Sequence, residues 1–492
     1  MPHSYEDALA HAEPAVLKAP RDSAAVVLLR RARSGEVEVF WARRARSMRF
    51  MGGWHAFPGG GLSPEDAATP LRGAARGCDQ ASRPALTPGW RGDKGSAEFR
   101  ALAACALREL SEETGLDVAD ASRLVYAGRW ITPPFSSRRY DTHFFSVELR
   151  PCEPGPTELS SELEEGEWIR PAAAVQRWRG GEVLLAQPTL HILRVLAENG
   201  PDEGRRRLQR PGETDPASLA AIEFRPGVSV VSQRTPTLPP ATHTNAFLVG
   251  GRDRVLIDPG SAEPEELARL ELAIESLVTR RGGKIVEIWL THHHRDHIGG
   301  AAEMRRRLGV PLRAHQTTAE HLTERGIKVD GYLEEGKTAE LEGEEEGDPA
   351  VRLRVLHTPG HARGHLCFFD EADGALIAGD MLASESTIVI DPPDGHMSDY
   401  LASLDKLQSL RPKFLFPSHG AMFADGERRL GALRKHRLWR EERVLEAWQT
   451  GVREPAEFLA SLYDGLEKAA HPLAERQIVA HLDRLRELGK IA

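Results

Sequence analysis

The sequence lacks both a long hydrophobic run and an excess of basic charge. Its longest apolar stretches, such as residues 24–29, are far shorter than the ~20 residues of a membrane-spanning helix. Residues 1–7 are polar and acidic, unlike the start of a signal peptide. The 64 Lys and Arg against 73 Asp and Glu give a formal net charge of -9, which provides no general attraction for nucleic acid or anionic lipid. We therefore expect a cytoplasmic protein that does not associate with membranes.

Cysteines are scarce, and none of them forms a CxxC pair. The four are Cys78, Cys105, Cys152 and Cys367, which argues against a disulfide framework and suits a reducing compartment. The chain is otherwise ordinary for a globular protein, with 40% hydrophobic and 28% charged residues. Its 492 residues are too many for one core and predict about three domains. The 20 histidines are unevenly distributed along the chain.

The pattern of strands, helices and turns divides the chain into four parts. Residues 20–198 combine strand-like runs with helices. Residues 199–221, which are rich in Gly and Pro and contain the arginine run 205–207, are predicted to be a linker. Residues 222–431 alternate short apolar strands with helices, which is typical of a layered α/β domain. Residues 432–492 are predicted to form three helices.

A cluster of glutamates ends a predicted helix in the first part. Glu109, Glu112 and Glu113 stand at positions i, i+3 and i+4, beside an apolar stripe that includes Leu110. Three like charges on one turn repel one another unless a hard cation lies among them, and carboxylate oxygens suit Mg²⁺ or Mn²⁺. Taken alone, the cluster is more typical of an exposed acidic helix face.

The glycine run at residues 57–61 and the segment 108–115, read together, resemble the Nudix box. That resemblance implies an α/β/α sandwich in which water attacks a diphosphate held by Mg²⁺ or Mn²⁺. It assigns roles to residues of the box and of a later loop: Glu112, Glu113 and Glu162 as metal ligands, Glu109 as a ligand or the catalytic base, Arg108 as the residue that orients the carboxylates, and Gly60 as part of the glycine loop.

The box departs from the usual pattern in one respect. An insertion that includes residues 73–95 separates the early acidic residue of the box from Arg108. The early acidic residue is Asp66, where glutamate is usual. This interruption, together with segments 130–133 and 139–145, resembles the Nudix branch that contains coenzyme A diphosphatases.

Histidines and aspartates follow several apolar strands of the third part. The segment 291–297 reads THHHRDH and comes after a predicted strand at 285–290. Parallel strands deliver such residues to one edge of an α/β sheet, where ligand sites form. Any single histidine here would more often be a surface or structural residue, but imidazole and carboxylate at this density suit a pair of Zn²⁺ ions. The residues concerned are His292, His294, Asp296, His297, His361, Asp380 and His419.

This ordered set resembles the metallo-β-lactamase fold, an αββα sandwich. The resemblance implies that the first zinc is bound by His292, His294 and His361. It implies that the second zinc is bound by Asp296, His297 and His419, that Asp380 bridges the two ions, that Asp296 also serves catalysis, and that Asp258 is structural. Iron or manganese could replace zinc, because ligand type alone does not separate these metals.

The C-terminal helices resemble the winged-helix tail of the β-lactamase-like-protein-2 branch, which includes a mitochondrial endoribonuclease. Charge disagrees with a nucleic-acid role, because residues 438–492 carry eight Lys and Arg against ten Asp and Glu. We expect this module to pack against the catalytic core or another subunit.

The sequence thus predicts a bifunctional metal-dependent hydrolase. Its second enzyme domain would act on single-stranded RNA, with the Nudix domain acting on nucleotide ends. Alternatively, it would be a thioesterase for acyl-CoA or hydroxyacyl-glutathione substrates, with the Nudix domain cleaving the coenzyme. A third possibility is that one domain is a non-catalytic binding module. The oligomeric state is left open.

Overall fold

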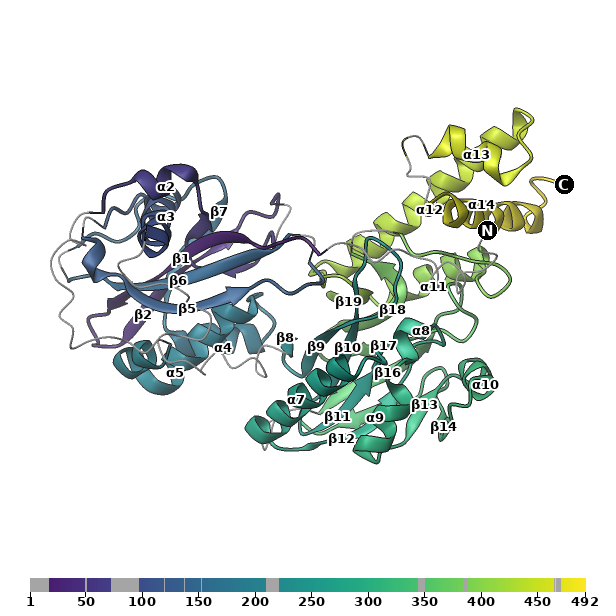
Figure 1. The fold of residues 1–492 in the computed structure, drawn as a ribbon, viewed down its shortest axis with the longest axis horizontal. Coiled ribbons are helices and arrows are strands. Elements are labelled where there is room, and N and C mark those ends of the chain that lie inside the picture. The colour runs from purple at the N-terminus through teal and green to yellow at the C-terminus, as the bar shows by residue number, and fades with distance from the viewer. Residues whose placement is uncertain are drawn as a thin grey trace. The chain divides into compact units, whose positions relative to one another are not determined.

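The computed structural model describes residues 17–48, 51–71, 97–118, 120–136, 138–151, 153–208, 221–343, 350–384, 387–463, 465 and 470–492. The insertion at residues 73–95 lies outside the described residues. The chain divides into two compact units, one of Lys18–Pro226 and the other built mainly of Gly227–Ala492 (Figure 1). Among the described residues, no helix has the length and apolar character needed to cross a bilayer.

The first unit is built on a seven-stranded mixed sheet with the path β3-β2-β1-β6-β5, to which β4 adds by pairing with β1 and β7 by pairing with β2. The pairing of β1 with β6 is parallel, and the others are antiparallel. The strands are β1 (Arg21–Arg31), β2 (Val37–Arg44), β3 (His55–Ala56), β4 (Gly59–Gly61), β5 (Val125–Ile131), β6 (Tyr140–Glu148) and β7 (Leu163–Ile169). The helices are α2 (Pro64–Ala68), α3 (Ala97–Thr114), the short 3₁₀ helix η2 (Ala121–Arg123), α4 (Pro171–Arg179) and α5 (Gln187–Leu208).

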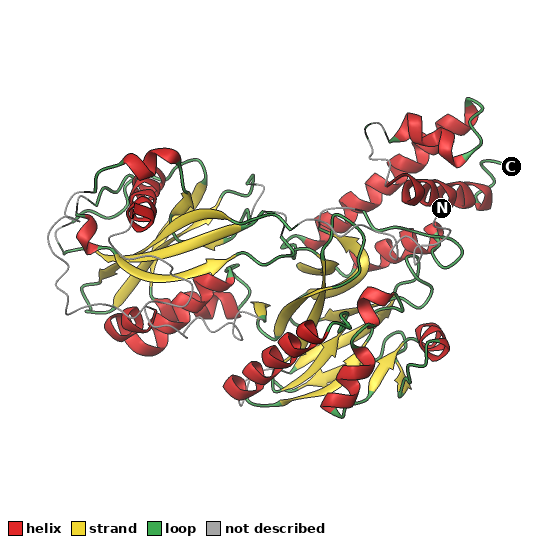
Figure 2. Cartoon of the chain, in the orientation of Figure 1, coloured by secondary structure: helices red, strands yellow, loops and turns green. Residues whose placement is uncertain are grey.

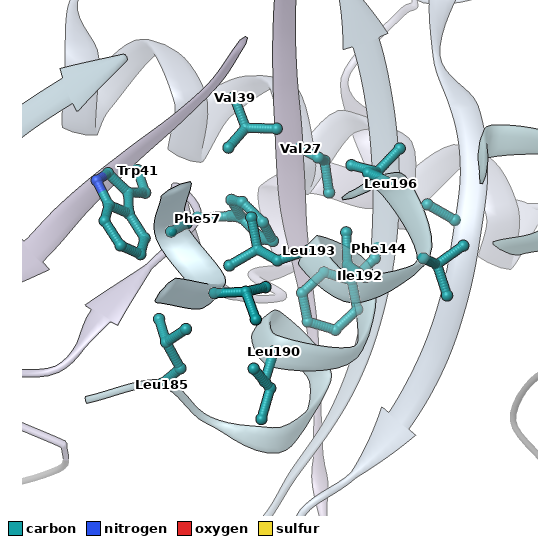
Figure 3. Close-up of a cluster of buried hydrophobic side chains, with 14 of the residues drawn as sticks. Val27, Val39, Trp41, Phe57, Phe144, Leu185, Leu190, Ile192, Leu193 and Leu196 are labelled. Carbon is teal, nitrogen blue, oxygen red and sulfur yellow. The ribbon is translucent and has the colours of Figure 1, made fainter. Parts of the chain in front are cut away.

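Helices cover both faces of this sheet because its central strand is apolar on both sides. Val27 and Leu29 of β1 belong to a buried cluster with residues of α4 and α5, including Leu193 (Figure 3). Val26 and Leu28 alternate with them and belong to a second cluster with residues of α3. The expected α/β/α sandwich of the first unit is therefore confirmed.

Helix α5 corrects the predicted linker. The helix continues to Leu208, so the arginine run at 205–207 is helical, and Leu208 is buried in the first-unit core. The Gly and Pro residues divide α5 into two helical segments. Gly200 has a φ of 71°, which ends one helical segment, and Pro201 begins the next. The short strand β8 (Ile222–Arg225) follows, and residues 209–220 of the predicted linker lie outside the described part.

The second unit contains two sheets that pack face to face. One runs β14-β13-β12-β11-β10-β9 and the other β15-β16-β17-β18-β19. Trp289 of the first sheet lies against Phe368 of the second, with ring centroids 5.1 Å apart. The first sheet consists of β9 (Val228–Arg234), β10 (His243–Gly250), β11 (Asp253–Ile257), β12 (Lys284–Trp289), β13 (Leu312–Ala314) and β14 (Gly331–Tyr332). The second consists of β15 (Thr338–Leu341), β16 (Val351–His357), β17 (Leu366–Asp370), β18 (Ala375–Ala383) and β19 (Phe414–His419).

Helices lie on the outer faces of both sheets (Figure 2). Helices α7 (Pro264–Arg281) and α9 (Ala301–Leu308) contact the first sheet. Helix α11 (Met397–Ser409) packs Tyr400 and Leu404 into a buried cluster with residues of β18 and β19. The shorter helices are α8 (Arg295–Ile298) and α10 (Gln316–Glu324). The layers form the predicted αββα sandwich.

The C-terminal segment forms three helices, as predicted: α12 (Gly426–Gln449), α13 (Pro455–Leu462) and α14 (His471–Glu487). The boundary predicted at 431/432 falls inside α12, so the chain has no break there. Ala480 of α14 belongs to the core cluster that contains α11, which agrees with packing on the catalytic core. In the described residues from 424 onward there is no strand, and so no wing of the predicted winged helix.

We expect Leu193→Ala to destabilise the first unit by about 2–5 kcal/mol, because Leu193 is fully buried and its removal leaves a cavity. Ile131→Ala is the matched control: Ile131 is 47% exposed, and we expect a loss of less than about 1 kcal/mol. Denaturant unfolding of the two variants measures the difference, and equal losses would contradict the assigned core.

Candidate metal centres

The seven predicted zinc ligands converge in the second unit, although they come from four parts of its chain. His292, His294, Asp296 and His297 lie in the loop after β12 and in the short helix α8 that follows it. His361 follows β16, Asp380 lies within β18, and His419 ends β19. All seven side chains are buried. The ends of strands from both sheets therefore meet at one site.

Three imidazoles form the first group. His292 Nε2 lies 3.0 Å from His294 Nδ1, and His361 Nε2 lies 2.9 Å from the same atom. Nitrogen ligands at 2.0–2.1 Å from one tetrahedral ion are about 3.3 Å apart, so the three atoms are close to the spacing that such an ion imposes.

The second group adds carboxylates. His419 Nε2 lies 3.4 Å from Asp296 Oδ2, and His297 Nε2 lies 3.8 Å from Asp296 Oδ1. Asp380 reaches both groups: its Oδ2 lies 3.5 Å from His361 Nε2, and its Oδ1 lies 3.6 Å from His297 Nε2. Asp380 thus has the position that a bridging ligand requires.

Buried atoms of this site lack hydrogen-bond partners within the described part of the chain. A buried polar atom without a partner costs ~1–3 kcal/mol and more when it is charged, so such atoms are rare in native proteins. Their concentration here fits divalent cations bound between the two groups. The atoms are both carboxylate oxygens of Asp296, Oδ1 of Asp380, and Nε2 of His297 and of His419.

Electrostatics leaves the imidazoles of the first group neutral, which is the form that binds metal. Burial, together with the neighbouring histidines, lowers the pKa of His292 and of His294 well below the usual range. Burial alone would raise the pKa of Asp380, but His419 and His297 outweigh it and hold the pKa well below its usual value. The carboxylate of Asp380 is therefore ionised.

Asp258, which was predicted to be structural, contacts Thr291 and His297 behind the ligand atoms. Its Oδ1 accepts the Thr291 N–H at 2.8 Å, and its Oδ2 accepts the Thr291 hydroxyl at 2.6 Å. The same Oδ2 lies 2.9 Å from His297 Nδ1, which turns Nε2 of that ring toward the site. A carboxylate behind an imidazole ligand sets the tautomer and the ring orientation.

Two backbone carbonyls also contact the ligands, and these contacts were not predicted from the sequence. His361 Nδ1 lies 2.7 Å from the Val389 carbonyl, and His419 Nδ1 lies 3.1 Å from the His243 carbonyl. Every residue carries a carbonyl, so no sequence signal could reveal these two. His365, four residues after His361, accepts the Asp380 N–H on Nε2 at 3.0 Å and so holds the backbone of that residue in β18.

In the first unit, Arg108 is the centre of an ion-pair network. Its guanidinium forms a bidentate pair with Asp66, at 2.9 and 3.0 Å. It also donates to Glu109 and to Glu112, each at 2.9 Å, and to the Gly61 carbonyl at 3.0 Å. Asp66 therefore replaces the usual glutamate as the partner of this arginine, in spite of the insertion between them.

Glycines bring the backbone close to the glutamates of α3. The Gly59 N–H donates to Glu113 Oε2 at 2.9 Å. A Cβ at Gly60 would lie 2.4 Å from the carboxylate carbon of Glu109, so any larger residue there would displace that carboxylate. Burial raises the pKa of Glu113 to about 7, and it also raises the pKa of Glu109.

The structure does not gather all of the predicted magnesium ligands. Within the described residues, the groups of three metal-type donor atoms within 4.8 Å all lie in the second unit. In the first unit, the guanidinium of Arg108 lies between the carboxylates of Glu109 and Glu112. Glu162 is exposed in the turn before β7, near enough to Glu113 to raise the pKa of that carboxyl.

We expect Asp258→Asn to weaken zinc binding by the second unit about 10- to 100-fold, because His297 loses the carboxylate that orients it. Competition with a chromophoric chelator measures the affinity. Asp253→Asn, at the other end of β11, is the control and should bind zinc as the parent protein does. Equal affinities of the Asp258 variant and the parent would contradict the supporting role.

Comparisons with known proteins identify a domain family in each unit. The profile of the metallo-beta-lactamase superfamily matches residues 239–419, and that of the NUDIX domain matches residues 86–186. Both families generally use divalent metals.

Among similar proteins is an atrochrysone carboxyl ACP thioesterase of Aspergillus fumigatus, 30% identical over 204 residues, which are 41% of this chain and 44% of that protein. The match thus spans less than half of this relative. The thioesterase nsrC of Aspergillus novofumigatus is 30% identical over 248 residues, 49% of this chain and 69% of that protein. A beta-lactamase-like protein 2 homolog of Drosophila melanogaster is 28% identical over 260 residues, 50% of this chain and 84% of that protein. On these similarities and on the seven converging side chains, the chain belongs to the metallo-beta-lactamase superfamily and carries a NUDIX domain in its first unit.

Proposed function

We propose that the chain is a bifunctional hydrolase in which the second unit cleaves a thioester with two zinc ions. The first unit cleaves a diphosphate-linked substrate with Mg²⁺ or Mn²⁺. The observation that carries the proposal is the set of five buried donor atoms without hydrogen-bond partners among the described residues, all of them on predicted zinc ligands.

The donors of the second unit suit zinc, since imidazole nitrogen and carboxylate oxygen are its common ligands. His292, His294 and His361 would hold one ion. Asp296, His297 and His419 would hold the other, with Asp380 between them. A bound pair of such ions would lower the pKa of a water molecule and polarise the carbonyl that the water attacks.

The residues of the chain would prepare this chemistry in three ways. Asp258 keeps Nε2 of His297 directed at the site through its contact with Nδ1. His365 holds the backbone of Asp380 through its N–H. Asp296 and Asp380 supply negative charge that offsets the cations, and Asp296 could accept a proton from the attacking water.

A thioester is favoured over RNA as the substrate of the second unit. Two of the relatives are named as thioesterases that act on a carrier-bound acyl group. A thioester of coenzyme A would also connect the two units, because the interrupted Nudix box resembles coenzyme A diphosphatases. The RNA alternative rested on the tail, whose acidic balance offers little attraction for phosphates.

In the first unit, Glu112, Glu113 and Glu162 would hold Mg²⁺ or Mn²⁺, with Glu109 as a further ligand or as the base. Arg108 now neutralises Glu109 and Glu112, so metal binding requires these carboxylates to move relative to the guanidinium. Its bidentate pair with Asp66 would keep Arg108 in place during that movement.

A panel of acyl-CoA, coenzyme A, nucleotide sugars and single-stranded RNA tests both assignments on two variants. Asp380→Ala should abolish thioester hydrolysis and zinc loading while Mg²⁺-dependent diphosphate cleavage persists. Glu112→Gln should lower diphosphate cleavage at least about 100-fold, because metal stabilisation contributes several kcal/mol, and should leave the thioesterase intact.

Surface carboxylates provide the controls for this panel. Asp405→Ala on α11 and Glu98→Gln on α3 should change neither activity, since both side chains are exposed. Hydrolysis of RNA without thioester hydrolysis would replace the proposed substrate. Retained zinc and activity in the Asp380 variant would overturn the site assignment itself.

The glycine loop gives an independent test of the first unit. In Gly60→Ala the new methyl group displaces the Glu109 carboxylate, and we expect diphosphate cleavage to fall at least tenfold, because misplacement by about 1 Å can cost ~100-fold. Gly61→Ala is the matched control, since a Cβ there meets nothing within 4 Å. Equal rates for the two variants would exclude a catalytic role for Glu109.

A further inference from the structure

A second cluster of metal-type side chains lies beside the seven-residue centre and takes no part in it. His293, His321 and Asp394 each offer one donor atom, and these atoms all lie within 4.8 Å of one another. His293 sits in the loop after β12, His321 on α10, and Asp394 in the turn before α11. We propose that this cluster is a third metal site in the second unit, which binds a single Zn²⁺ or similar transition-metal ion.

The two imidazoles and the carboxylate face one another. The rings of His293 and His321 are stacked, with centroids 4.1 Å apart and an angle of 18° between their planes. His293 Nε2 lies 3.6 Å from Asp394 Oδ2, too far for a hydrogen bond. The donor atoms are thus close together without being hydrogen-bonded to one another. A ring nitrogen binds a metal in the plane of its ring, so the two stacked rings do not both point at one ion as placed, and His321, whose side chain is 40% exposed, would have to turn when an ion binds.

Burial supports the same conclusion. The side chain of His293 is 8% exposed. Its Nδ1 and the Oδ2 of Asp394 are both buried and lack a hydrogen-bond partner among the residues that the structure describes. Asp394 Oδ1, by contrast, accepts the Arg363 N–H at 3.2 Å. One oxygen of the carboxylate is thus held by the backbone, and the other is left for a ligand inside the cluster.

The chemistry of the cluster selects a cation. An anion would meet the Asp394 carboxylate, which repels it. Two imidazoles with one carboxylate form a common set of zinc ligands, and three protein ligands leave a fourth position for water. Arg325 donates to the His293 carbonyl at 3.1 Å, and its positive charge opposes a cation. The third ion should therefore bind more weakly than the pair in the seven-residue centre.

The location of the site gives it a structural consequence. An ion there would join α10 and the turn before α11 to the loop that carries His292 and His294. Since His293 lies between these two ligands in the chain, the third ion would restrain the loop that holds the first zinc. This inference does not depend on the proposed substrate.

Metal counting tests the site. The full chain, with any affinity tag removed, is stripped with a chelator, reloaded with Zn²⁺ at a series of free concentrations, and analysed by mass spectrometry of the metal. We expect His321→Ala and Asp394→Ala each to bind one equivalent of zinc less than the parent at saturation. The lost equivalent should belong to the class of binding sites with the lowest affinity. Asp380→Ala should retain that class. Circular dichroism verifies that each variant is folded.

His357→Ala is the matched control. His357 also stacks on another histidine, His315, with centroids 4.3 Å apart and 7° between the planes. That pair belongs to none of the donor groups found in the described chain, so its loss should leave the zinc count unchanged. His321→Gln is a milder second variant, which should lose the same equivalent.

Three outcomes would overturn the proposal. One is an equal zinc count in the parent and in both His321 variants. Another is loss of more than one equivalent in the His321 or Asp394 variants, which would make the cluster a support of the seven-residue centre. The last is loss of an equivalent in the His357 control, which would indicate adventitious binding to surface histidines. If Asp380→Ala loses no zinc, that result counts against the proposed function. The third site is tested independently, by the zinc equivalents that the His321 and Asp394 variants lose.

Discussion

The burial of imidazole and carboxylate groups at one edge of the two packed sheets is the constraint on which the second unit depends. Removing such groups from water is costly unless each finds a partner. Several partners are supplied by the protein: Asp258 for His297, and backbone carbonyls for His361 and His419. The atoms that remain without partners lie close to one another, and divalent cations bound between them would serve as their common partners.

The architecture makes this concentration possible. The ends of β12, β16 and β19, together with the interior of β18, bring residues more than a hundred positions apart in the chain to one place. The Trp289–Phe368 contact joins the two sheets. Helices α11 and α14 close the outer face and keep β18, which carries Asp380, in the core. The C-terminal helices thus form part of the scaffold that supports the site.

The clustered carboxylates of the first unit are neutralised in a different way. One arginine, Arg108, pairs with the carboxylates of Asp66, Glu109 and Glu112, while the buried Glu113 accepts the Gly59 N–H. The buried Asp66 fixes that arginine from a position far away along the chain. Metal binding in this unit would have to compete with ion pairs, whereas metal binding in the second unit would fill positions that the protein leaves without partners. The two proposed metal sites would therefore differ in how tightly they hold their ions.

The sequence by itself determined the two sandwich folds, the seven converging side chains and the arginine–carboxylate helix, because each depends on local spacing and on residues that follow apolar strands. The predicted linker is helical through residue 208, because Pro201 begins a second helical segment whose Leu208 packs in the core. The sequence could not reveal the carbonyls of Val389 and His243. Nor could it show that His293, which separates two predicted ligands, faces His321 and Asp394. Those relations join segments distant in the chain, and only the packing of helices and loops around the strand ends decides which polar atoms meet.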